Sequence, residues 1–153
     1  MHDVELTYTD NSGGLLVIMP AVWMKLLKHR QLHLFSTEAA GVLIGERRDS
    51  HIVVHEISEP GYGDIRRRCF VDRRGPHHQA MVDDAFARSS GRLQYLGEWH
   101  THPEDSPSPS PTDFGTWRRH LFSDEQMALV IVGRKEIWAA KKISQEIIPL
   151  LKV

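Results

Sequence analysis

Apolar residues recur along this chain with two different periods, which predict strands alternating with helices. Alternating or continuous apolar runs predict strands at residues 15–19, 39–46, 51–58, 67–72, 93–100, 127–132, 136–143 and 147–151. Apolar positions three and four apart, each run opened by a proline, predict helices at residues 20–32, 77–89 and 111–122. Residues 1–13 look loosely ordered and end in the turn signal Ser12-Gly13-Gly14.

One apolar stripe on each helix predicts its buried face. The stripes are Val22, Leu26 and Leu27 continuing to His33 or Leu34; Met81, Ala85 and Phe86; and Phe114, Trp117 and Leu121. The strand at 39–46 is dense in small and branched residues and is expected to be central. Its glycines, Gly41 and Gly45, predict a close backbone approach where a ligand or a substrate strand can lie.

Composition and charge narrow the class of protein. The chain is 41% apolar and 25% charged, which is typical of globular proteins. Its 153 residues are expected to form one domain, 1–153. The formal net charge of −1 argues against general nucleic-acid binding. Local basic clusters such as Arg66–Arg68 are expected to be solvated, or else to meet an acidic partner.

Cysteine use and hydropathy indicate a cytoplasmic protein. Cys69 is the single cysteine, so an internal disulfide is excluded, and its place in a strand-like stretch predicts a packed thiol rather than a nucleophile. No apolar run has membrane length, and no basic-then-apolar leader opens the sequence. We therefore expect neither a membrane segment nor export.

The histidines His100 and His102 carry the strongest chemical signal. They lie two apart at the end of a predicted strand, so both imidazoles face the same way. Ser110 and Asp113 follow in the next loop. Two imidazoles and one carboxylate form a normal set of zinc ligands, and three protein ligands leave a fourth position open for catalysis. This pattern predicts a zinc hydrolase site.

Simpler interpretations exist for each part of this pattern. Ser110-Pro-Thr-Asp113 also has the form of a helix start, with serine at the N-cap and proline at the first position. The preceding Ser-Pro repeats alone are typical of a linker. Both interpretations of Ser110 and Asp113 can hold together, since a helix start is a rigid place from which to aim a carboxylate. The thermolysin-type pattern H-E-x-x-H is absent.

Taken together, two stretches of the chain resemble the JAMM motif of the JAB/MPN metalloprotease family. His100-Thr-His102-Pro, six further residues and Ser110-Pro-Thr-Asp113 match the family pattern H-x-H-P, six residues, S-x-x-D. Upstream, Glu38-Ala-Ala-Gly41-Val-Leu43-Ile-Gly45 resembles the family's E-x-x-G-x-L-x-G. The resemblance spans about residues 14 to 143. It implies an α/β (α+β) fold, the JAB/MPN cytidine-deaminase-like sandwich, with a mixed sheet flanked by about three helices.

The resemblance also implies a role for each motif residue. His100, His102 and Asp113 would hold one Zn²⁺ with its water, Glu38 would be the general base, and Ser110 would steady the tetrahedral intermediate. The bond cleaved would be an isopeptide or peptide bond after the C-terminus of a ubiquitin-like protein. A substrate tail is expected to lie as an extended strand beside residues 38–46. Glu98 points to the opposite face from His100 and is rejected as the base.

A further resemblance, to one group within the family, bears on the substrate. The phrase Tyr95-Leu-Gly-Glu-Trp-His-Thr-His-Pro103 resembles bacterial JAB proteins of integrative and conjugative elements, which accompany proteins like ubiquitin-activating (E1) and conjugating (E2) enzymes in CBASS antiphage systems. This implies a deconjugating peptidase that frees a cGAS/DncV-like nucleotidyltransferase from its targets. One alternative is a JAB protease that processes a sulfur-carrier protein, and another is a non-catalytic MPN scaffold.

Overall fold

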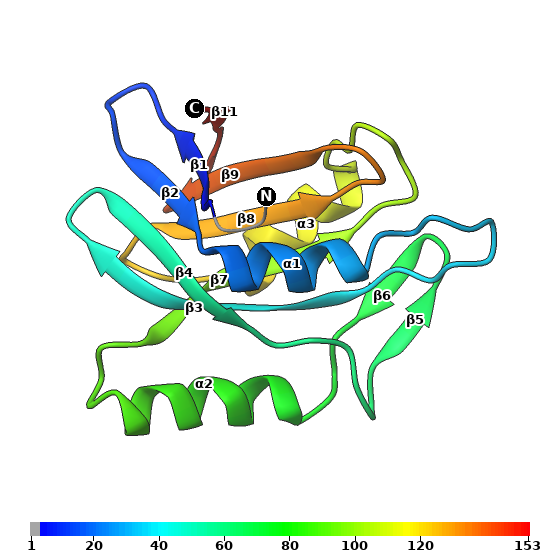
Figure 1. The fold of residues 1–153 in the computed structure, drawn as a ribbon, viewed down its shortest axis with the longest axis horizontal. Helices are drawn as coiled ribbons and strands as arrows, with labels where there is room; N and C mark the ends of the chain where they lie inside the picture. The colour runs from blue at the N-terminus through cyan, green and yellow to red at the C-terminus, as the bar shows by residue number, and fades with distance from the viewer. Residues whose placement is uncertain (1–3) are drawn as a thin grey trace.

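A computed structural model describes residues 4–153, and one large mixed sheet dominates it (Figure 1). Within those residues the sheet has nine strands in the order β10-β9-β8-β7-β3-β4-β2-β1-β11, and β5 and β6 form a separate hairpin. The strands are β1 (Leu6–Thr9), β2 (Leu15–Ile18), β3 (Ala40–Arg48), β4 (His51–Ile57), β5 (Ile65–Arg67), β6 (Phe70–Asp72), β7 (Gln94–Thr101), β8 (Met127–Val132), β9 (Ile137–Ile143), β10 (Glu146–Pro149) and β11 (Leu151–Lys152).

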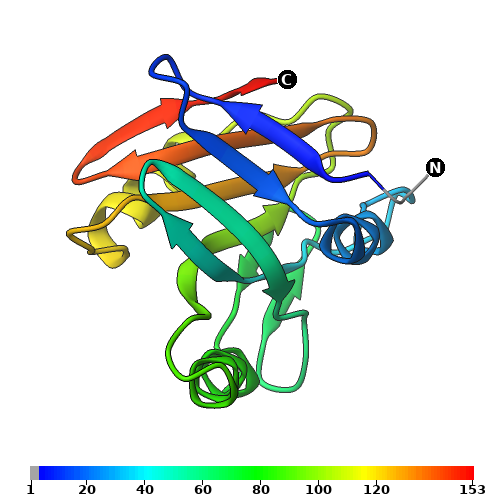
Figure 2. The same ribbon diagram turned by 60° about the vertical axis from the view of Figure 1, so that its left-hand side comes forward.

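In the described part of the chain, three helices cover the two faces of the sheet (Figures 1 and 2). They are α1 (Pro20–Lys28), α2 (His77–Arg88) and α3 (Pro111–His120). Val22 and Leu26 of α1 pack into the main apolar core on one face. On the opposite face, α2 packs against β3 and β7, while α3 packs against β8 and β9. The predicted fold class, a mixed sheet with about three helices, is confirmed.

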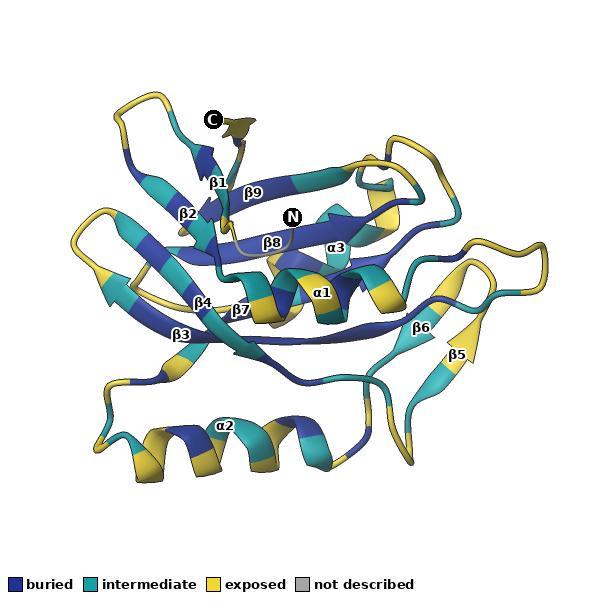
Figure 3. Ribbon diagram, in the orientation of Figure 1, coloured by how far each residue is buried: buried dark blue, intermediate teal, exposed yellow. Residues whose placement is uncertain are grey.

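The centre of the sheet is its most buried part (Figure 3). Strand β8 is buried at every position, in keeping with its continuous apolar sequence. Strand β7 runs parallel to β8 and antiparallel to β3. Side chains of β8 alternate between the cores of the two faces, so Val130 and Val132 meet the α1 side, and Leu129 and Ile131 meet the α3 side. The strand that carries the histidines is therefore held rigidly between two others.

The two ends of the sheet are joined by a single residue. Strands β10 and β11 stand at opposite ends of the sheet order, yet only Leu150 separates them in sequence. The amide N–H of Leu150 donates to the carbonyl of Ala139 at 2.9 Å, and that of Val153 donates to Thr7 at 3.0 Å. The sheet therefore curls until its ends approach each other. The prediction of one strand at 147–151 is wrong in this respect, because pairing partners are not visible in a single apolar run.

Several predicted boundaries shift in the structure. Residues 6–9 of the segment expected to be loosely ordered form β1, which pairs with β2 and β11, while residues 1–3 lie outside the described residues. Helix α1 ends at Lys28 rather than Leu32, with His29 at its C-cap, and beyond it the Gln31 side chain bonds the backbone carbonyls of Ser36 and Arg68. The single strand expected at 67–72 is the β5–β6 hairpin.

Three burial predictions are wrong. Cys69 is exposed, because it lies at the tip of the β5–β6 hairpin rather than inside a strand. Neither His33 nor Leu34 is buried, since the chain has already left the helix there. Phe86 is exposed because the buried side of α2 runs through His78 and Ala85, a spacing that places Phe86 off the contact face. In the described part of the chain, no helix is long and apolar enough to cross a membrane.

Candidate metal centre

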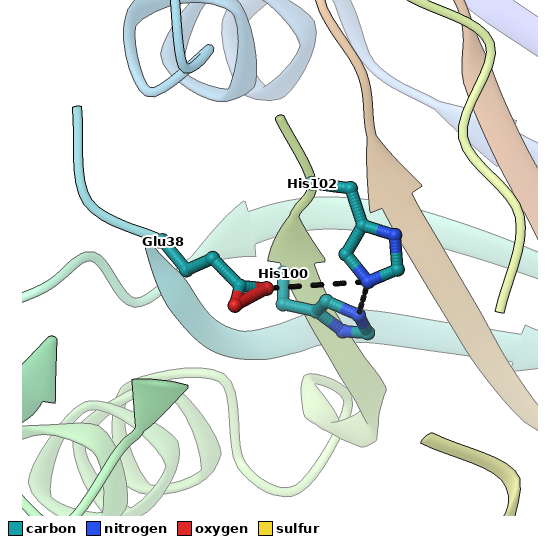
Figure 4. Close-up of side chains that lie close together, drawn as sticks. All are labelled: Glu38, His100 and His102. Carbon is teal, nitrogen blue, oxygen red and sulfur yellow. Dashed lines mark hydrogen bonds and ion pairs between the residues drawn. The ribbon is translucent and has the colours of Figure 1, made fainter. Parts of the chain in front are cut away.

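Antiparallel pairing of β3 with β7 brings the two motif halves together. Ala40 pairs with His100, and the amide N–H of Thr101 donates to the carbonyl of Ala39 at 2.9 Å. Glu38 stands just before the start of β3 and His102 just after the end of β7, so the register sets them at the same edge. Figure 4 shows the carboxylate of Glu38 pointing toward the two imidazoles.

The ligand atoms predicted for zinc converge on one point. The Nε2 atoms of His100 and His102 are 3.1 Å apart, and the Asp113 carboxylate oxygens lie 3.4 Å from His100 Nε2 and 3.1 Å from His102 Nε2. Tetrahedral coordination at zinc distances separates neighbouring ligand atoms by ~3.3 Å. The two nitrogens and the Asp113 carboxylate, whose Oδ1 faces His100 and whose Oδ2 faces His102, lie at separations that fit a zinc ion.

Asp113 is presented by the start of helix α3. Its backbone N–H donates to Ser110 Oγ at 3.0 Å, and its carboxylate accepts from the Ser110 N–H at 2.9 Å, which together form a capping box. Burial opposes the charged carboxylate, but hydrogen bonds to His100 and His102 outweigh it and hold the pKa of Asp113 well below its usual range. Asp113 is thus both a residue of the predicted helix start and the predicted metal ligand.

Glu104 fixes the orientation of His102. The Nδ1 atom of His102 lies 2.8 Å from Glu104 Oε1, so its N–H donates there and leaves Nε2 to face Asp113. Burial lowers the pKa of His102, but bonds to Asp113 and Glu104 outweigh burial and raise that pKa to about 9. An environment that draws a proton onto a buried imidazole also favours a metal cation in the proton's place. Sequence reasoning missed this role, whose only signal is a carboxylate two residues after the second histidine.

Glu38 is buried beside the histidines but makes a looser contact. Its side chain is 7% exposed, and its Oε1 lies 4.0 Å from His102 Nε2. Burial raises the pKa of Glu38 to about 7. A carboxylate with such a pKa can both accept and return a proton near neutral pH.

Other residues near the site have structural partners. The Trp99 indole N–H donates to the carbonyl of Ser58 at 3.0 Å, and Trp117 stacks on Trp138 with its centroid 6.0 Å from the His100 ring. Both tryptophans are almost fully buried. Glu98 forms an ion pair with Arg73. The tryptophans therefore brace the site, and Glu98 is engaged elsewhere.

Strand β3 offers no free edge for most of its length. It pairs with β7 from Ala40 to Gly45 and with β4 from Leu43 to Arg48. A Cβ atom at Gly41 would come within 2.0 Å of the Ser58 carbonyl oxygen. The close backbone approach at this glycine is thus made by the chain itself, and the predicted substrate strand beside residues 38–46 is wrong for the paired part of β3.

A second cluster of potential ligands lies between the 59–64 loop and the start of α2. Ligand atoms of Asp64, His77 and His78 all lie within 4.8 Å of one another. His78 Nδ1 is 2.5 Å from Ser58 Oγ, and its Nε2 is 3.0 Å from Asp64. His77 Nε2 is 2.6 Å from the carbonyl oxygen of Glu59. The sequence showed His77 and His78 only as residues of a helix start.

Comparisons with known proteins identify a family and several named relatives of this chain. A family model of prokaryotic homologs of the JAB domain matches residues 20–146. A Vibrio cholerae serotype O1 protein named CD-NTase/cGAS isopeptidase is 60% identical, over 99% of this chain and 97% of its own. An Escherichia coli protein of the same name is 49% identical over the same shares. A probable metalloprotease of Sinorhizobium fredii is 31% identical over 66% of each chain.

The fold also occurs among solved structures. The solution structure of a Desulfitobacterium hafniense protein superposes with a TM-score of 0.62 and is 19% identical. The match covers 86% of this chain and 87% of that protein. At this level of identity the likeness concerns the fold alone.

Proposed function

This chain belongs to the family of prokaryotic homologs of the JAB domain, and we propose that it is a zinc-dependent isopeptidase. Its relatives are named as isopeptidases and a metalloprotease, which places the chain among hydrolases. The observation that carries the zinc assignment is the convergence of His100, His102 and Asp113 at 3.1–3.4 Å. When bound there, zinc supplies the Lewis acidity that makes water a nucleophile near neutral pH.

Glu38 is the proposed general base and acid. It takes a proton from the attacking water and returns it to the nitrogen of the leaving amine, so that its carboxylate is regenerated in each turnover. Its burial and its position 4.0 Å from His102 support this role. A metal cation beside it favours the carboxylate over the acid form, which readies Glu38 to accept the first proton.

Ser110 is the proposed donor to the developing oxyanion. Its Oγ accepts the N–H of Asp113, and no acceptor for its own hydroxyl proton is present among residues 4–153. That proton is therefore available to the negative oxygen that forms when the amide carbonyl is attacked. The capping box holds the hydroxyl oxygen on the backbone N–H of Asp113, a predicted metal ligand, and hence at the edge of the site.

The proposed substrate is a conjugate of a CD-NTase, a cGAS/DncV-like nucleotidyltransferase. Two relatives that match nearly the whole chain, at 60% and 49% identity, are named for this substrate. The enzyme would cleave the amide that joins the CD-NTase C-terminus to a target, reversing the work of E1/E2-like proteins in an antiphage system. A sulfur-carrier protein is the alternative substrate. The other alternative, a non-catalytic scaffold, would require an inactive site.

Cleavage of a CD-NTase carrying a protein fused to its C-terminus tests this proposal. Wild type, Glu38→Gln and wild type with a zinc chelator are compared, and a sulfur-carrier fusion serves as the second substrate. We expect cleavage at the CD-NTase junction, loss of about 10³-fold or more in turnover in Glu38→Gln, and recovery of chelated enzyme on adding zinc. Preference for the sulfur-carrier fusion would overturn the substrate, and full activity of Glu38→Gln would overturn the mechanism.

A further inference from the structure

A buried hydrogen-bond network joins the residue next to Glu38 to the residue between the two histidines. Thr101 lies between His100 and His102, and its Oγ1 accepts the backbone N–H of Ala39 at 2.9 Å. The Thr101 N–H donates to the carbonyl of Ala39 at the same distance. The network thus ties Ala39, which directly follows Glu38, twice to one residue of the ligand strand.

Gln31 completes this network from outside the sheet. The Thr101 hydroxyl donates to Gln31 Oε1 at 2.9 Å, and the Gln31 amide nitrogen donates to the carbonyls of Ser36 at 3.1 Å and Arg68 at 2.8 Å. Gln31 is 1% exposed and Thr101 is fully buried. Every N–H and O–H donor of the two side chains is used and each side-chain oxygen accepts one bond, and the reversed amide would set its oxygen against two carbonyls.

The same network reaches the catalytic base through the β5–β6 hairpin. The backbone N–H of Glu38 donates to the carbonyl of Arg67 at 2.7 Å, and the carbonyl of Glu38 accepts from Arg66 Nε at 2.8 Å. With the bond from Gln31 to Arg68, three consecutive hairpin residues are fixed around Glu38. No helix or strand contains Glu38, so these bonds set the position of its backbone.

We infer that Gln31, acting through Thr101, is a positioning residue that holds Glu38 in register with His100 and His102. This inference rests on the proposed function, in which Glu38 must meet water at the metal. Neither Gln31 nor Thr101 has a side-chain bond to a predicted metal ligand. Loss of the network should therefore move the base while leaving the metal ligands in place.

The test compares Thr101→Val, which keeps the shape and removes the hydroxyl, with Thr101→Ser, which restores it. For Thr101→Val we expect kcat to fall about tenfold to hundredfold, with KM within about twofold and zinc content unchanged. Thr101→Ser should stay within about threefold of wild type. In metal-free protein, the Ala39 amide should exchange faster with solvent in Thr101→Val than in wild type, while amides in the middle of β3 keep their protection.

Two further variants separate positioning from general stability. Gln31→Met should lower kcat in the same way, and the double variant with Thr101→Val should lower it no further than the stronger single change. Val54→Ala removes packing in the middle of β4, where Val54 pairs with Gly45 rather than with the Ala40 end of β3, and serves as a control of similar destabilisation, with wild-type kcat expected.

The outcomes distinguish failure of this inference from failure of the proposed function. Unchanged kcat in Thr101→Val, with an active wild type, would overturn the positioning role. Loss of zinc together with kcat, or an equal loss in Val54→Ala, would overturn it as well, since either result means that the network acts through the ligands or through stability. A wild type that cleaves no amide substrate would overturn the proposed function, whereas faster Ala39 exchange in Thr101→Val would still support the network.

Discussion

Residues 4–153 contain two clusters of histidines and carboxylates, and one of them is the proposed metal centre. In the first, His100, His102 and Asp113 make three mutual contacts of 3.1–3.4 Å. In the second, at the start of helix α2, His78 Nε2 lies 3.0 Å from the Asp64 carboxylate and His77 Nε2 lies 3.9 Å from it. Convergence of ligand atoms is common to both, so convergence alone does not identify a metal site.

The difference lies in how protons can be placed. When two imidazole nitrogens and an ionised carboxylate all contact one another, no placement of protons satisfies all three contacts. If both nitrogens carry a proton, their N–H groups face each other; if one does not, its lone pair faces the carboxylate anion. A cation at the centre removes that repulsion. In the second cluster a single proton assignment satisfies every contact: Ser58 donates to His78 Nδ1, His78 Nε2–H donates to Asp64, and His77 donates to Glu59. We interpret the second cluster as a hydrogen-bonded brace.

The largest expected difference in zinc content and cleavage is between two variants that each remove one histidine, one from each cluster. His100→Ala should lose bound zinc and all measurable cleavage, because two ligands remain for a site that needs three. His77→Ala should keep about one zinc per chain and near wild-type kcat, because its partner is the backbone carbonyl of Glu59. Metal content by mass spectrometry and cleavage of the CD-NTase fusion measure both.

Zinc stoichiometry decides whether the comparison holds. About two zinc ions per wild-type chain, with one lost in His77→Ala, would make the second cluster a metal site and refute the proton argument. Asp64→Asn is a further check, since it removes the carboxylate charge from the second cluster while leaving residues 98–113 untouched.

A smaller effect is expected from substituting Ser110 and Ser58, one serine beside each cluster. They differ in whether the hydroxyl proton has an acceptor. Ser58 uses its proton on His78, whereas the Ser110 proton has no acceptor within the described residues. Ser110→Ala should therefore lower kcat about 10²-fold with zinc retained, and cost about 0.5–2 kcal/mol of stability as a lost helix cap. Ser58→Ala should keep kcat and lower the free energy of unfolding by about 1–3 kcal/mol. Wild-type kcat in Ser110→Ala would reduce Ser110 to a helix cap.

Sequence alone predicted the parts of the fold and site that depend on local pattern. The alternation of β7 predicted that His100 and His102 share a face, and Ser110-Pro-Thr-Asp113 predicted a helix start that the structure has as a capping box. The pairing of Ala40 with His100 has no local signal, so only the family resemblance brought Glu38 to the site. The assignment of the site residues to catalysis stays a prediction until variants are measured.

Long-range hydrogen bonds were beyond sequence reasoning. Gln31 is polar and lies at the end of an amphipathic run, so its place in the predicted helix was reasonable. It lies outside the helix, and its amide protons go to the carbonyls of Ser36, five residues away, and of Arg68, which approaches only in the folded chain. His78 likewise is buried by a loop that begins twenty residues earlier, at Ser58. Buried polar residues of this kind depend on partners that no period of apolar positions reveals.

The smallest expected effect is a pH dependence of stability that distinguishes the brace from the metal centre. Burial lowers the pKa of His78; Asp64 opposes this shift, whereas His77 and Arg73 add to it. Because the folded pKa is depressed, the contribution of neutral His78 is complete above its unfolded pKa of about 6.5. It is lost as the pH falls through the folded pKa, since the unfolded chain takes up the proton first.

His78→Gln isolates this contribution, because glutamine fills similar space and does not titrate. At pH 8, metal-free wild type should exceed the variant in free energy of unfolding by about 1–3 kcal/mol, the cost of a disturbed buried hydrogen bond. That difference should shrink as the pH is lowered below about 6.5, and denaturant titrations at a series of pH values measure it. Subtracting the variant removes the titration of the other histidines. A difference that grows toward acid pH would mean that the folded pKa of His78 is raised, and a constant difference would mean that it is not depressed; either result would contradict a neutral buried brace.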